Sequence, residues 1–274
     1  MPELPEAETI VRDLRPRLLG RRILSVAVRH PDVLGRTTDP ERLHDAVAGA
    51  TLAAVERRGK NVLLRLAEGP VLAFNLGMTG RLLTSDAPAA AGMAHVTVRF
   101  QLDNETELLF DDVRRFGRVD VYTPGDWALR TTELGVEPLE DEFTPERLHA
   151  LTRTSRSPIR NWLLDQRRVA GIGNIYANEA LFRAGVRPSR RANTLRREDT
   201  RRLRETLREV LAEAIGARGT TFRDYRDAQG DPGGYEPRLR VYDRAGQPCT
   251  TCGTAIKRAV LSNRSAFYCP QCQR

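Results

Sequence analysis

Four cysteines within the last 26 residues constrain the fold of this chain more than any other feature. They form two Cys-x2-Cys pairs with sixteen residues between them: Cys249, Cys252, Cys269 and Cys272. This spacing predicts four thiolates around one structural zinc ion, with no coordination position left open for a substrate. Two disulfides are the alternative, but nothing else in the chain is typical of a secreted protein. Because so small a module buries little apolar surface, the metal would supply much of its folding free energy.

The charge of the chain is distributed unevenly along its length. The 274 residues carry 44 Lys+Arg against 36 Asp+Glu, a net charge of +8. Residues 1–145 contribute −5 to this total and residues 146–274 contribute +13. A basic half of this size predicts a polyanion partner, because arginines that neutralise phosphates gain from counterion release. A solvated basic surface without a partner is the alternative.

The sequence shows no sign of a membrane protein. No apolar run reaches the roughly 18 residues that a spanning helix needs. The N-terminus, MPELPEAETIV, is acidic where a signal peptide would be basic and then apolar. We therefore expect a cytoplasmic protein, and we expect it to be a monomer.

Two different hydrophobic periods predict an α+β fold. Residues 22–122 consist mostly of short, alternating apolar runs between turn-forming residues, which favours an antiparallel β-sandwich, and an opening helix is expected from about Pro5 to Leu18. An acidic stretch at 135–142 predicts a linker, after which the period becomes helical. The expected helices are 145–153, 157–165, 174–184 and 197–217, with a mobile loop at 85–92 and a flexible Gly/Pro-rich loop at 219–240.

Two motifs have the composition of nucleic-acid contacts. Gly171–Asn174 opens a helix, where free backbone N–H groups favour a phosphate, although a tight corner between helices also needs glycines. Arg114, Arg115 and Phe116 place two guanidinium groups beside an aromatic ring, which suits phosphate contact and insertion of the ring into a base stack. Ordinary surface arginines at a strand end explain the second motif equally well.

The N-terminus offers a nucleophile. Removal of Met1 would expose the secondary amine of Pro2, and an α-amino pKa of about 7.7 to 8.0 leaves such a group partly unprotonated at neutral pH. This amine can attack an electrophilic sugar carbon, and Glu3 beside it could transfer protons. From these residues alone, an acidic cap on the first helix is the simpler interpretation.

In combination, these motifs resemble the formamidopyrimidine-DNA glycosylase family over essentially the whole chain. The matching segments, in the family's order, are PELPEAET at 2–9, NLGMTG at 75–80, RRFG at 114–117, GIGNIYA at 171–177 and FYCPQCQ at 267–273. The resemblance implies a bifunctional DNA glycosylase and AP lyase of base excision repair. Such an enzyme excises oxidised purines, typified by 8-oxoguanine and formamidopyrimidines, from damaged double-stranded DNA and cuts the strand by β,δ-elimination. The implied domains are a catalytic β-sandwich (1–134), a helical helix-two-turn-helix domain (135–230) and the zinc finger (238–274).

The resemblance also implies a role for each site residue. Pro2 would attack C1′ of a flipped nucleotide, with Glu3 as proton donor and Glu6 in support. Lys60 matches the family's proton donor in β-elimination. Arg264 matches the arginine assigned to δ-elimination, which we interpret as phosphate binding because arginine is a very poor acid. The implied DNA contacts are Met78, Arg114 and Phe116, which would fill the space left by the flipped base, together with His95, Arg115, Arg156, Arg160 and Asn174.

Two departures from the family pattern and two rival functions remain. Asn75 and Met93 stand where the family often has histidines that touch the DNA backbone. The first rival is the sister glycosylase for oxidised pyrimidines, of the endonuclease VIII type, which uses the same proline chemistry. Leu4 favours the purine branch, because the pyrimidine branch typically carries glycine there. The second rival is a zinc-finger DNA-binding protein without catalysis.

Overall fold

The computed structural model describes residues 2–67, 69–86 and 94–274, which form two compact units. Unit 1 comprises the residues up to 132 together with 217–234, and unit 2 comprises 133–216 and 235–274. Most of the expected loop at 85–92 lies outside the described residues, as do Met1 and Met93. The segment 217–234 belongs to unit 1 by its contacts, although the helix before it belongs to unit 2.

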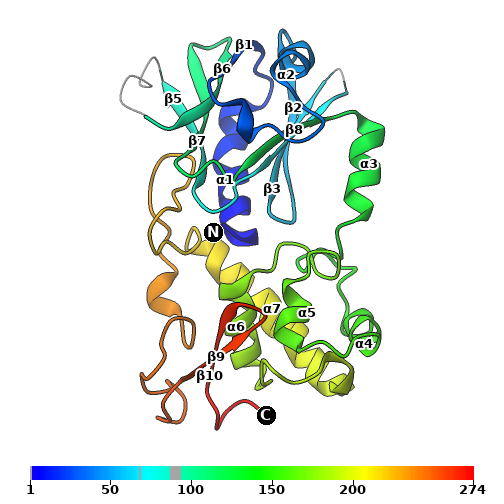
Figure 1. Cartoon of the computed structure of the whole chain (residues 1–274), viewed down its shortest axis with the longest axis vertical. Coiled ribbons are helices and arrows are strands. Elements are labelled where there is room, and N and C mark those ends of the chain that lie inside the picture. Colours follow the sequence, from blue (N-terminus) through cyan, green and yellow to red (C-terminus); the bar gives the residue numbers. More distant parts are fainter. Residues whose placement is uncertain (1, 68, 87–93) are drawn as a thin grey trace. The chain divides into compact units, whose positions relative to one another are not determined.

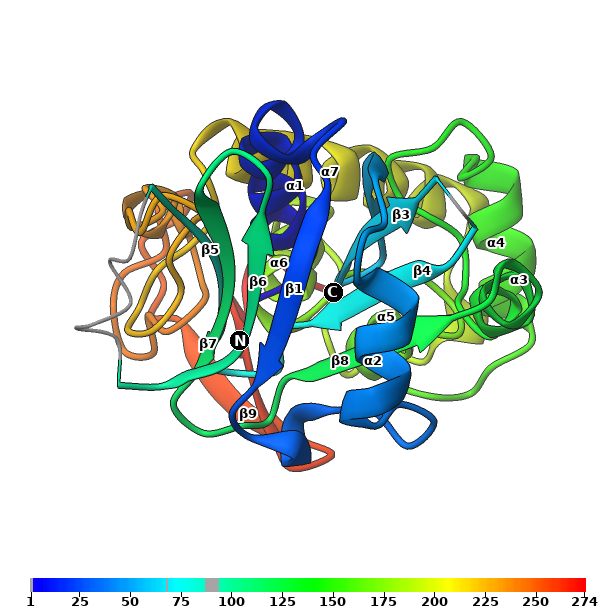
Figure 2. The same ribbon diagram turned by 90° about the horizontal axis from the view of Figure 1, so that it is seen from above.

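Unit 1 is built around an opening helix and two antiparallel sheets, most of whose strands are labelled in Figure 1. Helix α1 (Leu4–Leu18) begins with Pro5 in its first turn, where a missing N–H costs nothing. The sheets have the strand orders β1-β6-β7-β5 and β2-β3-β4-β8, and Figure 2 shows β5, β7, β6 and β1 side by side. The strands are β1 (Ile23–Val28), β2 (Leu52–Arg58), β3 (Asn61–Leu66), β4 (Val71–Asn75), β5 (Gly80–Asp86), β6 (Val96–Leu102), β7 (Thr106–Asp112) and β8 (Arg118–Tyr122), connected in part by η1 (Pro31–Val33), α2 (Pro40–Val47) and α3 (Pro124–Thr132).

The core of unit 1 lies between the two sheets. Phe74 on β4 contacts Phe100 on β6 and Phe110 on β7 edge to face, with ring centroids 6.0 Å and 5.8 Å away. All three rings are fully buried, and the apolar face of α1 joins the same cluster through Ile10 and Leu14. The predicted β-sandwich with an opening helix is therefore confirmed.

Unit 2 is helical apart from one C-terminal hairpin. Helix α4 begins at a threonine N-cap, where Thr144 Oγ1 accepts a hydrogen bond from Arg147 N at 3.1 Å. The buried stripe of α7 contains Leu203, Leu207 and Leu211, as its helical period predicts. The elements are α4 (Pro145–Arg153), α5 (Ile159–Leu164), α6 (Asn174–Arg183), η3 (Ala192–Thr194), α7 (Arg197–Gly216), η4 (Glu236–Arg238), β9 (Lys257–Leu261) and β10 (Arg264–Tyr268).

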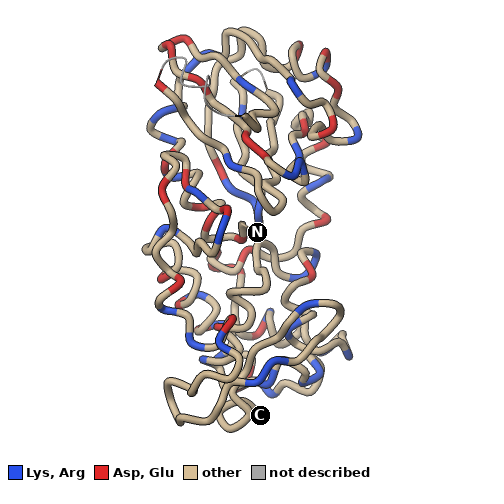
Figure 3. Tube along the Cα trace, turned by 60° about the vertical axis from the view of Figure 1, so that its left-hand side comes forward, with Lys and Arg blue, Asp and Glu red and all other residues tan. Residues whose placement is uncertain are grey.

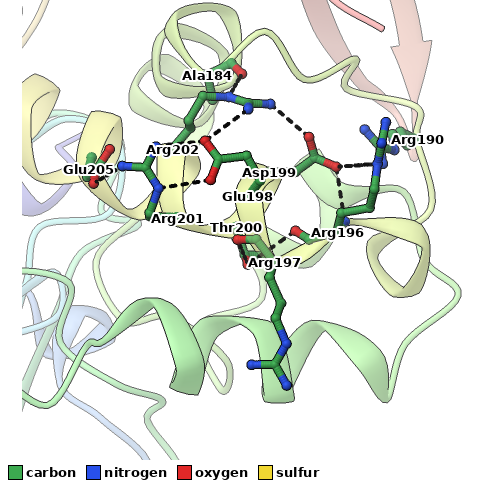
Figure 4. Close-up of polar contacts among 10 residues, drawn as sticks. All are labelled: Ala184, Arg190, Arg196, Arg197, Glu198, Asp199, Thr200, Arg201, Arg202 and Glu205. Atoms are coloured by element: carbon green, nitrogen blue, oxygen red, sulfur yellow. Dashed lines mark hydrogen bonds and ion pairs between the residues drawn. The ribbon is translucent and has the colours of Figure 1, made fainter.

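The first turn of α7 is held by one buried carboxylate (Figure 4). Asp199 accepts hydrogen bonds from Arg196 N at 3.0 Å and from the guanidinium groups of Arg190 and Arg202, both at 2.8 Å. Burial raises the pKa of Asp199, but these donors outweigh it and leave the pKa lower than usual. An anion at this position also complements the positive end of the helix dipole.

The two units differ in net charge. Unit 1 contains 21 basic and 21 acidic residues, whereas unit 2 contains 23 basic and 15 acidic residues, a net charge of +8. Figure 3 marks these charges along the chain. The whole positive excess therefore belongs to the helical, cysteine-containing unit.

No helix among the described residues is long and apolar enough to cross a membrane.

We predict that Phe110→Ala lowers the free energy of unfolding by about 3–5 kcal/mol, because it removes a ring from a closed aromatic cluster and leaves a cavity. Urea denaturation followed by tryptophan fluorescence measures the change. Leu129→Ala is the matched control, since Leu129 on α3 is 71% exposed and its truncation should cost less than about 0.5 kcal/mol. Equal losses in the two variants would contradict the assignment of the core.

Candidate active site and nucleic-acid interface

The N-terminus is built around one buried carboxylate. Glu6 Oε2 accepts a hydrogen bond from Glu3 N at 2.7 Å, so the acid fixes the backbone next to Pro2. Glu3 and Glu6 are 2% and 1% exposed, and Pro2 is buried as well. Two carboxylates removed from water beside a proline nitrogen form a site suited to proton transfer.

The second oxygen of Glu6 holds the segment 217–234, which we call the Glu6 loop. Thr220 N donates to Glu6 Oε1 at 2.8 Å. Gly219 has a φ of +85°, and a Cβ there would lie 2.9 Å from the same oxygen, so only glycine lets the backbone approach this closely. Glu6 therefore connects the N-terminal residues to a segment more than 200 positions away in the sequence.

Buried side chains hold the Glu6 loop in place. Tyr225 and Ala228 belong to the main apolar cluster of unit 1. Burial and the nearby Glu6 charge raise the pKa of the Tyr225 phenol, which stays protonated. Strand β5 binds the loop backbone, through Arg81 Nε to Asp224 O at 2.9 Å and Thr84 N to Ala228 O at 3.2 Å. The predicted loop is present, but the flexibility expected from its composition does not fit these anchors.

Lys60 lies in the tight turn between β2 and β3. Gly59 before it adopts φ +59°, and Arg57 supports the turn by donating from Nη1 to Gly59 O at 3.1 Å. Arg57 Nε in turn donates to Glu8 on α1 at 3.0 Å. The Lys60 side chain is half-buried and is carried by a turn that an ion pair fixes to the first helix.

Asn75 takes part in a network beside this turn. Its Nδ2 donates to Asn61 Oδ1 at 3.0 Å, and its Oδ1 accepts from Gly77 N at 3.1 Å. Asn75 therefore links the Lys60 turn to the loop that carries Met78.

Three exposed side chains of unit 1 form a cluster. The guanidinium carbon of Arg114 lies 4.5 Å from the centre of the Phe116 ring, and Arg114 Nη1 lies 3.7 Å from Met78 Sδ. Met78 is 42% exposed and Phe116 is 52% exposed, although both are large and apolar. We call Met78, Arg114 and Phe116 the wedge. An exposed apolar group with a cation beside it suits insertion into a base stack.

Asp112 holds the backbone on either side of the wedge residues through hydrogen bonds. Its Oδ2 accepts from Gly117 N at 2.7 Å, and its Oδ1 accepts from Thr79 Oγ1 at 2.5 Å and from Arg114 N at 3.2 Å. The carboxylate is 1% exposed. It closes the turn that presents Arg114 and Phe116, and it fixes the neighbouring loop through Thr79.

Arg115 and His95 are exposed and border this region. Arg115 has a φ of +54°, and its Nη1 lies 3.4 Å from His30 Nδ1 and from Asp32 Oδ2. His95 O accepts from Asp112 N at 3.0 Å, which places His95 opposite the end of β7. Burial raises the pKa of neighbouring Asp111, and the charges of Arg81 and His95 oppose that rise.

In unit 2, Asn174 and Arg160 connect α5 and α6 to the C-terminal hairpin. Arg160 is fully buried and uses all five of its N–H groups within the protein. Nε and Nη2 donate to Asn174 Oδ1 at 3.1 and 2.7 Å, and Nη2 also donates to Ser265 O at 2.9 Å. Nη1 donates to Asn161 Oδ1 at 2.9 Å and to Leu261 O at 3.0 Å.

The direct phosphate contact expected of Arg160 does not fit this arrangement, because no N–H remains to donate. Burial and the nearby charge of Arg264 lower the pKa of Arg160. Its bonds to Leu261 O and Ser265 O enclose the turn of the hairpin, where Arg264 is exposed. Arg156 is also exposed. The structure therefore divides the expected contacts into solvent-facing arginines and a buried one that holds the hairpin.

The four cysteines come together as predicted. Their Sγ atoms all lie within 4.8 Å of one another, with Cys249 and Cys272 at 3.9 Å and Cys252 and Cys269 at 3.5 Å. Four sulfurs about 2.3 Å from a tetrahedral zinc would be separated by about 3.8 Å. Phe267 and Val241 pack against the cluster. The donor set and its spacing fit one structural zinc ion.

Several functional groups had no clear signal in the sequence. Asp112 stands beside the Arg114 motif. An aspartate directly before a turn is a sequence signal that could have identified its structural role. Glu179, fully buried on α6, accepts from three consecutive backbone amides, Arg240 N, Val241 N and Tyr242 N, at 2.8 to 2.9 Å. Thr220 acts through its backbone N–H, which no residue type identifies.

Acids around the N-terminus, an exposed wedge and a zinc hairpin define the class of protein: a DNA glycosylase with a C-terminal zinc finger. Family models match nearly the whole chain. The N-terminal domain of formamidopyrimidine-DNA glycosylase matches residues 1–119, its H2TH domain matches 134–226, and the zinc finger found in FPG and IleRS matches 246–274. The chain belongs to the formamidopyrimidine-DNA glycosylase family.

Individual relatives agree over the full length. The chain is 46% identical to the formamidopyrimidine-DNA glycosylase of Chloroflexus aggregans, covering 100% of this chain and 98% of the relative, and 43% identical to that of Pelotomaculum thermopropionicum, covering 100% and 99%. The MutM (Fpg) protein of Thermus thermophilus superposes with a TM-score of 0.87 at 41% identity, covering 99% and 98%. A Lactococcus lactis Fpg variant in complex with Fapy-dG containing DNA superposes with a TM-score of 0.91 at 30% identity, covering both chains fully.

We predict that Cys272→Ser lowers the zinc content from about one ion per chain to well below one, because a hydroxyl is a far weaker zinc ligand than a thiolate. Mass spectrometry of the metal content checks this. Thr251→Ala, in the first knuckle but outside the four ligands, should keep the metal. Full zinc retention in Cys272→Ser would rule out the four-cysteine site.

We further predict that truncation of Arg156 weakens DNA binding, whereas truncation of Arg160 destabilises unit 2. Arg156→Ala should reduce the salt dependence of DNA affinity by about one counterion without changing the melting temperature, because an exposed phosphate contact is lost. Arg160→Ala should lower the free energy of unfolding by about 3 kcal/mol, because buried carbonyl and amide oxygens lose their donors. Fluorescence anisotropy at several salt concentrations and thermal melting measure both effects. Identical behaviour of the two variants would contradict this division.

Proposed function

We propose that this protein excises oxidised purines from duplex DNA and then cleaves the strand, with Pro2 as the nucleophile. The observation that carries the proposal is the Glu6 carboxylate, which binds Glu3 N and Thr220 N at once and so sets two buried acids beside Pro2. The exposed wedge and the basic unit 2 support a DNA substrate. Relatives of known structure bind DNA that contains Fapy-dG or an abasic site.

The first step takes the damaged nucleotide out of the helix. A proline amine cannot reach C1′ inside a base stack, so the nucleotide must be flipped. Phe116 and Met78 would occupy the opened stack, and Arg114 would face the base left unpaired. Arg115, Arg156, Asn174, Arg264 and His95 would hold the backbone, with Arg160 as the support of Asn174 and of the hairpin turn.

The chemistry then proceeds through a covalent intermediate. After removal of Met1, the lone pair of Pro2 N forms a bond to C1′ while the bond from C1′ to the base breaks, and Glu3 supplies the proton that the departing base needs. The proton on Pro2 N then passes to O4′ as the bond from C1′ to O4′ breaks, which opens the sugar ring and gives an iminium at C1′ and a hydroxyl at C4′. Loss of a C2′ proton then expels the 3′ phosphate by β-elimination, assisted by Lys60, and δ-elimination expels the 5′ phosphate, which Arg264 would bind.

Zinc has no part in these steps. When bound, it stabilises the hairpin fold, since four cysteine ligands fill its coordination shell. The hairpin in turn carries Arg264 at its exposed turn.

We propose that the protein acts as a monomer in the cytoplasm.

We predict faster release of 8-oxoguanine opposite cytosine than of thymine glycol in single-turnover assays on matched duplexes. A Lactococcus lactis Fpg complex with oxidised-pyrimidine DNA makes the pyrimidine lesion the proper comparison.

Glu3→Gln should slow base release by about 10²- to 10⁴-fold, because the amide cannot donate the proton, and the variant should still bind a duplex with an abasic-site analogue. Faster release of thymine glycol would assign the protein to the pyrimidine branch, and unimpaired release by Glu3→Gln would remove Glu3 from the mechanism.

A further inference from the structure

Arg218 has a backbone conformation that its residue type disfavours. It lies at the start of the Glu6 loop, just after α7, and adopts φ +62° in the left-handed region. A side chain with a Cβ costs free energy in that region, where glycine would cost little. An arginine at this position therefore calls for a compensating contact by its side chain.

The side chain of Arg218 bridges two buried carboxylates from distant parts of unit 1. Nη2 donates to Asp13 Oδ2 on α1 at 2.6 Å. Nε and Nη2 donate to Asp227 Oδ2 in the Glu6 loop at 2.9 and 2.5 Å. The Asp13 side chain is 7% exposed and that of Asp227 is fully buried, whereas Arg218 is 42% exposed.

This bridge holds the loop closed on itself and on α1. Asp227 Oδ1 also accepts from Gln229 N at 3.0 Å and from Asp231 N at 2.9 Å, so the carboxylate organises the turn at the far end of the loop. Removal of the guanidinium would leave two buried carboxylates near each other without their shared cation. Burying unpaired like charges is unfavourable, so the loop would move away from α1.

A displacement of the Glu6 loop would reach the candidate active site, because Arg218 lies next to the residues that contact Glu6. Thr220, whose N–H binds Glu6, follows it by two residues, and Gly219 between them lies against Glu6 Oε1. A displacement of Arg218 is therefore transmitted directly to the Thr220 N–H and through Glu6 to Glu3 N.

We propose that Arg218 is a positioning residue for base release: by bridging Asp13 and Asp227 it fixes the Glu6 loop on α1 and holds Thr220 N–H on Glu6. This inference rests on the proposed function, since it assigns Glu3 and Glu6 to base excision. It concerns the step in which a base departs. Attack of Pro2 on an abasic site needs no proton for a leaving base and depends less on the loop.

Three substitutions at one position test the proposal. Arg218→Ala should slow single-turnover release of 8-oxoguanine by about 10- to 100-fold, the scale expected when a distant change misplaces catalytic groups. Arg218→Gly removes the backbone strain together with the bridge and should be equally slow. Arg218→Lys keeps the charge but lacks the forked donors and should recover part of the rate. If Arg218→Gly releases base at the wild-type rate, Arg218 only occupies a strained turn and the proposal fails.

A double-mutant cycle and a second substrate complete the test. Asp13→Asn should also slow base release, and in combination with Arg218→Ala it should add less than about twofold, because both changes break one bridge. Borohydride trapping on a preformed abasic-site duplex should stay within about twofold of wild type in every variant. Equal losses on both substrates with a lowered melting temperature would show general destabilisation and overturn the proposal. Failure of the proposed function is distinguishable, because the wild-type protein itself would then give no trapped adduct.

Discussion

One carboxylate determines how the N-terminal site is assembled. Glu6 accepts Glu3 N–H with one oxygen and Thr220 N–H with the other, so the first helix and the Glu6 loop cannot be positioned independently. At 1% exposure the carboxylate is removed from water, so loss of either of these hydrogen bonds is costly. The placement of Glu3 therefore depends on a loop that the chain reaches only after the rest of unit 1 and helices α4 to α7 of unit 2.

Buried carboxylates organise three further irregular segments in the same way. Asp112 gathers the backbone of the wedge, Asp227 the turn of the Glu6 loop, and Glu179 the three amides that precede the zinc hairpin. Each carboxylate is nearly or fully buried and accepts several donors. Such acids replace the regular hydrogen bonds that helices and strands would supply. These acids face inward, while Arg114, Arg156 and Arg264 face solvent.

The sequence could predict what depends on local or periodic signals, and little of what depends on distant partners. Helix α4 followed from its Thr144 cap and α7 from its leucine period, and the cysteine spacing alone indicated the metal site. The burial of Arg160 could not be foreseen, because its acceptors in the hairpin lie about 100 residues away. Gly and Pro content predicts flexibility over 219–240, but Arg218, directly before this range, ties Asp227 within it to Asp13, 205 residues away from Arg218. Composition describes the backbone freedom of a segment and says nothing about the side chains that remove it.

The central claim is that Pro2 is the nucleophile, and the composition of the chain makes this unusually easy to test. Besides the N-terminus, the amines able to form a Schiff base are Lys60 and Lys257, since all other Lys+Arg residues are arginine. Borohydride reduction of the protein on an abasic-site duplex, followed by peptide mapping, identifies the linked residue. We predict one adduct, on a peptide that begins at Pro2, and none in a protein with an N-terminal extension, where Pro2 N is an amide. An adduct on Lys60 or Lys257, or trapping by the extended protein, would contradict it.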